Sequence, residues 1–376
     1  MNKDFPSFSL ERLLNTVFNP EKGQRVAILV DFEDTSEIID FKFLGNENYP
    51  IQNRAHKYFY SELKDGLAAK LGLEGGEIFA YKMTQGSNLD LPDEAISPEG
   101  KKVSLEKDIY TSYDIILCIS TMSATAPLTA FAKQYGFRGA TLHGLNDVIL
   151  NSGLAVDYNE VSPQAEKLRL GMTKAEAVEL DFEIGGKKET LRIELAKQEA
   201  QKSHGLCTGG PDIANLPAGE IYFVPQDAKG TFPHKFEDGT ITLMNVEGGR
   251  ITSAKFLSGS EQTYKEYTEK LEKDPAVGLI GELGFGTQVL PVSGADIQDE
   301  KVLGTFHIAT GRSDHLGGNI TPDQFQYAIN ASHDDILFAP HKTPEVKAPE
   351  VRLIKDGKSH VLIKDYKPAE FMLNLL

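Results

Sequence analysis

The chain has 376 residues, a size at which a single hydrophobic core usually gives way to two, so we expect two domains. Its 55 acidic residues outnumber 39 lysines and arginines, giving a net charge of −16. A surface of this sign repels phosphate backbones and anionic membranes, which excludes nucleic acid and membranes as expected partners.

The beginning of the chain, MNKDFPSFSLERLLNTVFNP, lacks the long apolar core of a signal peptide. No stretch reaches the roughly 18 apolar residues that span a bilayer. We therefore expect a cytoplasmic protein. Its two cysteines, Cys118 and Cys207, form no C-x-x-C pair, and we interpret both as small buried hydrophobes.

Residues 1–165 alternate between strand and helix patterns. The apolar run 25–33 predicts a buried strand, and 55–76 has helical spacing that stops at glycine. Similar patterns predict further strands at 76–83, 114–120 and 139–145, a helix over 121–137, and a long loop over 84–111. This rhythm predicts an α/β domain with a parallel sheet covered by helices. A G-x-G-x-x-G fingerprint and a P-loop are both missing from it.

Residues 166–376 have a different texture, for which we predict an α+β, β-rich, metal-binding domain. The stretch 165–180 is helix-like, and 179–195 alternates around Gly-Gly, which is typical of a hairpin. Short strands follow at 219–225, 239–246 and 249–257, then an amphipathic helix at 260–274 and a hairpin with Asp-Gly at its turn over 351–365.

Five acids and imidazoles of this second domain lie in apolar or glycine-rich surroundings, where they are costly unless something compensates them. His333 and Asp335 are two residues apart, which places both on one face of a strand. A divalent cation compensates several such groups at once. The group comprises Glu220, Glu282, His307, His333 and Asp335.

Each residue also has a simpler interpretation. A histidine in an apolar strand can be a core residue bonded to a backbone carbonyl, and a glutamate between glycines can be a loop acid. His333 and Asp335 can belong to the N-terminal cap of a helix. The five together favour a metal site.

Four segments in this order, NLPAGEIYFVP, GELGFGT, DEKVLGTFHIATG and SHDDI, resemble the aminopeptidase T family of metalloaminopeptidases. The resemblance covers the C-terminal half. It implies metal ligands at Glu220, Glu282, His307, His333 and Asp335, and a sixth at Glu300, although the spacing from Glu300 to His307 is longer than in the family. It also implies a homodimer.

One departure concerns catalysis. Where the family has a tyrosine thought to assist catalysis, this chain has Asp314, followed by His315. A phenol donates a hydrogen bond to an oxyanion at neutral pH, whereas an ionised aspartate cannot. Asp314 and His315 are therefore candidates for a replacement acid–base pair or a further ligand, or they form an exposed turn before two glycines.

We accordingly predict a metal-dependent, aminopeptidase-like hydrolase that acts on a short peptide or another small molecule. Two divalent cations, zinc, cobalt or manganese, would share Glu282 and activate water. One alternative is a mononuclear iron(II) ring-cleaving dioxygenase of the same superfamily, against which the glutamate at position 282 argues. A second alternative is a metal-binding homologue without peptidase turnover.

Overall fold

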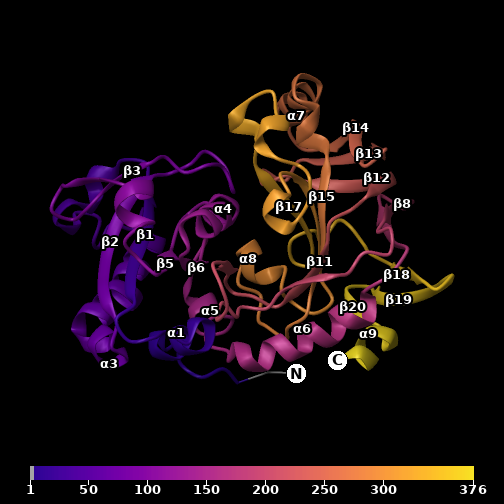
Figure 1. Cartoon of the computed structure of the whole chain (residues 1–376). Helices are drawn as coiled ribbons and strands as arrows, with labels where there is room; N and C mark the ends of the chain where they lie inside the picture. The colour runs from indigo at the N-terminus through magenta and orange to yellow at the C-terminus, as the bar shows by residue number, and fades with distance from the viewer. Residues whose placement is uncertain (1–3) are drawn as a thin grey trace. The chain divides into compact units, whose positions relative to one another are not determined.

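The computed structural model describes residues 4–376 and divides into two compact units (Figure 1). Unit 1 consists of Met1–Ser162, His204–Ala218 and Leu290–Gln298. Unit 2 consists of Pro163–Ser203, Gly219–Val289 and Asp299–Leu376. Unit 1 therefore includes two short segments from the second half of the sequence.

A seven-stranded sheet forms the centre of unit 1, in the order β10-β6-β5-β1-β2-β3-β4. Alternate residues of β1 contribute to two separate apolar clusters, Val26 and Ile28 to one and Ala27 and Leu29 to the other, so both faces of the sheet are covered. The strands are β1 (Arg25–Phe32), β2 (Glu74–Lys82), β3 (Glu94–Ile96), β4 (Lys102–Ser104), β5 (Ile115–Cys118), β6 (Arg138–Thr141) and β10 (Ile213–Asn215).

The sheet of unit 1 is mixed. The strands from β10 to β2 run parallel, but β3 and β4 add to the edge in antiparallel orientation. Both lie in 84–111, which we predicted as a loop; strands of three residues are too short to leave a pattern. The α-helices are α1 (Leu10–Phe18), α2 (Pro50–Ala55), α3 (Ala68–Leu71), α4 (Thr125–Tyr135), α5 (Asp147–Leu150) and α8 (Asp296–Asp299), and π-helical turns at His56–Tyr60 and Leu63–Leu67 lie between α2 and α3.

Unit 2 contains two sheets. The larger has eight strands in the order β14-β13-β12-β8-β7-β18-β19-β20, and the smaller has five in the order β17-β16-β15-β11-β9. The larger sheet consists of β7 (Ala177–Ile184), β8 (Lys187–Glu194), β12 (Asp227–Lys235), β13 (Ile241–Glu247), β14 (Arg250–Ser258), β18 (Glu350–Lys355), β19 (Lys358–Lys364) and β20 (Lys367–Pro368). The smaller consists of β9 (Gln201–Ser203), β11 (Glu220–Phe223), β15 (Ile280–Gly286), β16 (Phe306–Gly311) and β17 (His333–Phe338).

Both sheets contribute to one apolar core. Phe182 of the larger sheet lies with its ring centroid 4.9 Å from that of Phe338 and 6.1 Å from that of Phe306 in the smaller sheet. Because side chains alternate along a strand, this packing leaves the opposite face of the smaller sheet available for polar residues.

One predicted helix in unit 2 is too long. We expected helix over 165–180, but α6 (Tyr158–Met172) ends earlier and Ala177–Ile184 forms β7, paired with β8 and β18. The alanines and glutamates of 174–180 favour a helix locally, but pairing on both edges buries the alternate residues Val178 and Leu180. The remaining helices are α7 (Glu261–Lys273) and α9 (Glu370–Leu375).

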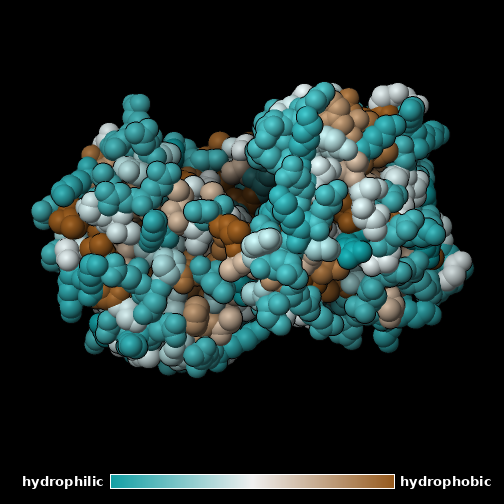
Figure 2. Space-filling view, turned by 90° about the horizontal axis from the view of Figure 1, so that it is seen from above, coloured by the Kyte–Doolittle hydropathy of each residue, from teal (hydrophilic) through white to brown (hydrophobic). Residues whose placement is uncertain are grey.

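Hydrophilic side chains predominate on the face seen in Figure 2, and hydrophobic ones are scattered in small groups. This distribution agrees with the net charge of −16. Among the helices of residues 4–376, none has both the length and the apolar character needed to cross a bilayer.

Candidate metal centre

The polar face of the five-stranded sheet gathers five of the sequence-predicted residues in unit 2. Their apolar neighbours Ile221, Leu283, Ile308 and Ile336 face the core instead, as the alternation of a strand requires. β11 carries Glu220, β15 carries Glu282, β16 carries His307, and β17 carries both His333 and Asp335.

Small residues make room for these side chains. Ala309 of β16 pairs with Glu282 of β15 on one side and with Asp335 of β17 on the other. The small methyl side chain of Ala309 therefore lies between the two acids. Gly284 pairs with His307, and a β-carbon there would lie only 2.2 Å from His307 Nε2. The glycine of Glu-Leu-Gly therefore lets the imidazole lie over the strand.

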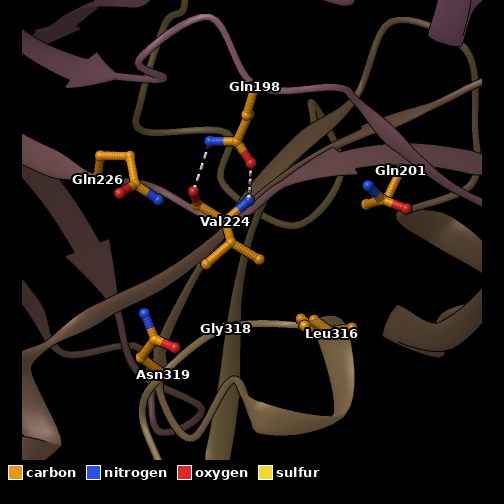
Figure 3. A pocket seen from close by; sticks show the side chains of 8 residues that line it. Gln198, Gln201, Val224, Gln226, Leu316, Gly318 and Asn319 are labelled. Atoms are coloured by element: carbon orange, nitrogen blue, oxygen red, sulfur yellow. Dashed lines mark hydrogen bonds between the residues drawn. The ribbon is translucent and has the colours of Figure 1, made fainter.

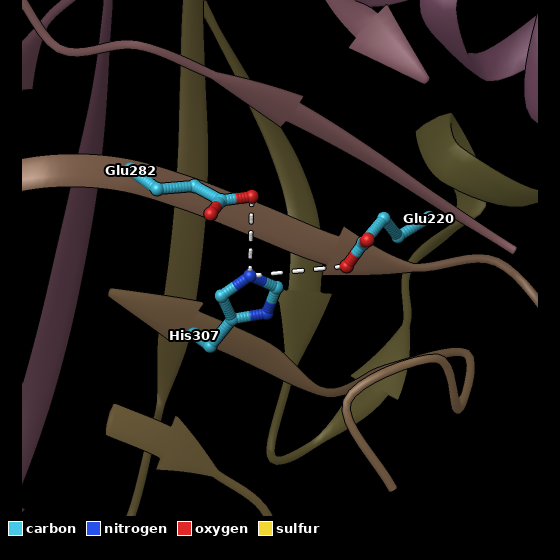
Figure 4. Close-up of side chains that lie close together, drawn as sticks. All are labelled: Glu220, Glu282 and His307. Carbon is cyan, nitrogen blue, oxygen red and sulfur yellow. Dashed lines mark ion pairs between the residues drawn. The ribbon is translucent and has the colours of Figure 1, made fainter. Parts of the chain in front are cut away.

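Glu282 lies between the two histidines. Its Oε1 is 3.4 Å from His307 Nε2, and its Oε2 is 3.0 Å from His333 Nε2. His307 Nε2 is also 3.8 Å from Glu220 Oε2, and Figure 4 shows it aimed at both carboxylates. Each oxygen of Glu282 thus faces a different imidazole, which is the arrangement expected of a carboxylate shared by two ligand sets.

The backbone orients His333. Its Nδ1 donates to the carbonyl oxygen of Arg312 over 2.5 Å, which directs Nε2 toward Glu282 and toward Asp335 Oδ1 at 3.4 Å. A histidine that binds a metal commonly has its second nitrogen bonded in this way. Glu220, Glu282, His307 and His333 are all buried, whereas the side chain of Asp335 keeps 31% of its surface exposed.

Oxygen and nitrogen atoms close enough to hold one cation occur in three overlapping groups among the described residues. In each group the potential ligand atoms lie within 4.8 Å of one another. The groups are Glu220–Glu282–His307, Glu282–His333–Asp335 and Glu300–His307–Asp335. All six residues predicted as ligands therefore converge, Glu300 included, although its longer spacing to His307 departs from the family pattern.

Lys301 is a member of this cluster that sequence reasoning missed. Its side chain is buried; Nζ lies 2.6 Å from Glu220 Oε1 and also donates a hydrogen bond to Glu300 Oε1. Asp299, the other acid of the Asp-Glu pair, has a different partner: its Oδ2 lies 2.9 Å from His341 Nε2. A lysine beside an Asp-Glu pair reads as an ordinary surface residue, so the sequence carried no signal for its burial.

Asp314 and His315 lie beside the cluster and outside its three groups. Arg312 donates to Asp314 from Nε at 2.7 Å, and the His315 ring packs edge-on against that of His333, with centroids 4.9 Å apart. Burial opposes ionisation, but His315 and Arg312 hold the pKa of Asp314 well below its usual range. Asp314 is thus an ionised hydrogen-bond acceptor. Of the pair Asp314 and His315, it is His315 that contacts a residue of the cluster, His333.

Without a cation the neighbouring carboxylates favour the protonated form of both imidazoles. Burial lowers the pKa of His307, but the hydrogen bond with Glu282 and the charge of Glu300 outweigh it and raise the pKa to about 10. His333 is raised well above its usual value, also against burial, by Asp335 and Glu282. Burial raises the pKa of Glu300 to about 8 despite the Lys301 ammonium. Burial by itself would raise the pKa of Glu282, but hydrogen bonds from both histidines keep this pKa well below the usual range.

These shifts predict how the metal-free protein responds to pH. His307 stabilises the fold fully below its ordinary pKa of 6.5 and loses this contribution as the pH rises toward about 10. Glu300, protonated more readily when folded, acts in the same direction up to about 8. We expect the melting temperature to fall by at least about 2–4 °C between pH 6.5 and 9.

Differential scanning calorimetry of chelator-treated protein measures this slope. H307Q is the control and should make the slope shallower, because the contribution of His307 is lost while that of His333 stays. Zinc binding must displace the protons held by His307 and Glu300, so the rise in melting temperature caused by added zinc should increase from pH 6.5 to 9. A metal-free protein that becomes more stable toward pH 9 would contradict the assignment.

Unit 2 has a hollow of about 240 Å³ that is lined by other residues than those of the cluster (Figure 3). It is lined by Gln198, Gln201, Val224, Gln226 and the segment 316–319, which follows His315. The side-chain Nε2 of Gln198 donates a hydrogen bond to the backbone carbonyl of Val224 at 2.7 Å. Its polar side chains are amides, whereas those of the cluster are carboxylates, imidazoles and a lysine.

Comparisons with known proteins inform the fold. No family model matches the chain, and no curated protein matches it. The chain is similar to the structure of 2,5-dihydroxypyridine dioxygenase from Pseudomonas putida KT2440, with a TM-score of 0.59, 14% identity and 92% of each chain covered. It also matches wild-type AmpT from Thermus thermophilus, with a TM-score of 0.49, 14% identity, and 96% of this chain and 98% of that one covered. At this identity the first likeness shows a shared fold.

Proposed function

We propose that this protein is a metal-dependent hydrolase that removes residues from the N-terminus of short peptides. The observation that carries the proposal is Glu282, whose two oxygens face His307 and His333 within a carboxylate-rich cluster. A donor set of carboxylates and imidazoles suits zinc, manganese or cobalt.

The residues present fit a divalent cation. Glu220 Oε2 is buried and has no hydrogen-bond partner among residues 4–376, so it offers a lone pair toward His307 and Glu282. His333 Nε2 is oriented toward the same space by the Arg312 carbonyl. Glu282, His307, His333 and Asp335 would hold divalent metal, which when bound supplies Lewis acidity that makes water nucleophilic near neutral pH.

The chain's own residues have separate tasks in this proposal. Glu220, a member of the cluster, provides a carboxylate oxygen that can accept a proton from water or a hydrogen bond from the substrate's amine. Asp314 and Arg312 hold the turn that keeps His315 against His333, a positioning role that we propose in place of the tyrosine chemistry. The homodimer stays a prediction.

A second candidate is an iron(II) dioxygenase. His307, His333 and Asp335 supply two imidazoles and one carboxylate, the set that non-haem oxygenases use, with Asp335 Oδ1 at 3.9 Å and 3.4 Å from the two Nε2 atoms. The central position of the carboxylate of Glu282 between both histidines favours the hydrolase, because an iron triad needs positions left open for substrate and oxygen.

Turnover assays separate the two. The zinc-, manganese- or cobalt-loaded protein is expected to release amino acids from short peptides or aminoacyl anilides, to lose at least about 99% of this activity with chelator and to recover it when metal returns. The control is the same protein loaded with iron(II) and given oxygen and a dihydroxypyridine. Ring cleavage there, with no hydrolysis in any metal form, would replace the hydrolase by the dioxygenase.

A further inference from the structure

Lys301 brings a positive charge of the chain's own into the candidate metal centre. None of its surface is exposed, and its Nζ is within hydrogen-bond distance of one oxygen each from Glu220 and Glu300. A lysine is almost never fully buried unless it is paired, and here both partners are residues that the sequence predicted as metal ligands. A lysine is ordinarily an ammonium at neutral pH, and two acidic side chains within hydrogen-bond distance of its Nζ favour that charged form.

The backbone fixes this ammonium in place. The amide of Gln288 donates to the carbonyl of Lys301 at 2.9 Å, and Gln288 forms a bridge with Val302 beyond the end of β15. The Thr305 hydroxyl bonds the carbonyl oxygens of Asp299 and Glu300, each at 3.2 Å. The loop carrying Lys301 is thereby attached to the strand that carries Glu282, and the charge cannot swing out to solvent as a surface lysine would.

The cluster consequently has two unlike ends. At one end Glu282, His333 and Asp335 come together without a lysine or arginine ion pair among the described residues. At the other end Glu220 and Glu300 already share the Lys301 ammonium. A divalent ion bound through Glu220 Oε2 would compete with an ammonium held by the other oxygen of the same carboxylate, and like charges repel strongly where water is excluded.

We propose that Lys301 takes the place of one of the two expected cations. The chain then holds a single divalent ion tightly, at the end formed by Glu282, His333 and Asp335, while the ammonium supplies the positive charge beside Glu220 and Glu300. This inference rests on the proposed metal-dependent function and changes its ion count. Glu220 Oε2, buried and unbonded in the described structure, is left as an acceptor for a substrate donor.

The count of bound zinc tests the inference. Full-length protein is dialysed against buffered zinc, and bound zinc per chain is measured by plasma mass spectrometry, with affinities from calorimetry. Wild-type protein is expected to bind one ion. K301M should bind two, because removing the ammonium strengthens the second site by about a hundredfold or more. K235M is the matched control: Lys235 is also paired in unit 2, with Glu345 at 2.9 Å, and its loss should leave one ion.

Each outcome has one meaning. Two zinc ions in wild-type protein, or one in K301M, would overturn the role of Lys301 and leave the metal-dependent function standing. No zinc in wild-type protein would instead overturn the proposed function. If K301M does not fold, K301Q decides the matter, because its amide removes the charge but can still donate a hydrogen bond to the buried carboxylates: a second ion supports the inference and a single ion refutes it.

Discussion

Glu282→Gln is expected to abolish tight cation binding and, with it, hydrolysis. Glu282 belongs to two of the three ligand groups, and each of its oxygens faces one histidine. An amide has no charge and only one acceptor oxygen, so it cannot serve both imidazoles. Because even partners outside the ligand set change metal affinity by about 10–100-fold, the loss of this central ligand should weaken zinc by at least about 100-fold.

Calorimetric titration with zinc measures this affinity, and the peptide assay should fall in parallel. E247Q, at an exposed glutamate of β13, is the control and should bind as wild type does. The metal-free variant should also lose about 3–5 kcal/mol of stability, since the charged imidazoles of His307 and His333 lose their buried partner. Zinc affinity unchanged in E282Q would remove Glu282 from the ligand set.

Asp335→Asn and Asp334→Asn form a matched pair of adjacent substitutions with opposite expected results. Asp335 lies 3.4 Å from His333 Nε2 and belongs to two ligand groups. Asp334 points to the other face of β17, is exposed, and accepts a hydrogen bond from the Ser332 hydroxyl at 2.7 Å. We expect D335N to weaken zinc about 10–100-fold and D334N to leave it unchanged.

The same titration on both variants provides the measurement, and circular dichroism checks that each is folded. Equal losses in the two variants would point to a general effect of charge at this strand rather than to ligation. A D335N protein that keeps full zinc affinity but loses turnover would recast Asp335 as a proton acceptor.

Parts of the fold followed from local patterns. Strand periodicity predicted the segments that became β7, β8, β11, β13 and β14, and the charge pattern of 260–274 predicted α7 almost to its ends. The failures are also local in origin. At 174–180 good helix formers lie in a strand because pairing with β8 and β18 outweighs their propensity, and β3 and β4 are too short to leave a signal.

The sequence by itself determined the donor types and one local geometry: His333 and Asp335, two residues apart, face the same side of whatever strand they occupy. Only the tertiary structure decided that β11, β15, β16 and β17 lie side by side, that Gly284 and Ala309 open the space between them, and that Lys301 enters it. The reason is physical. Side-chain alternation is a property of a few neighbouring residues. Strand order and the burial of a lysine depend instead on contacts between segments that are distant in the chain, such as β11 with β15 and Lys301 with Glu220.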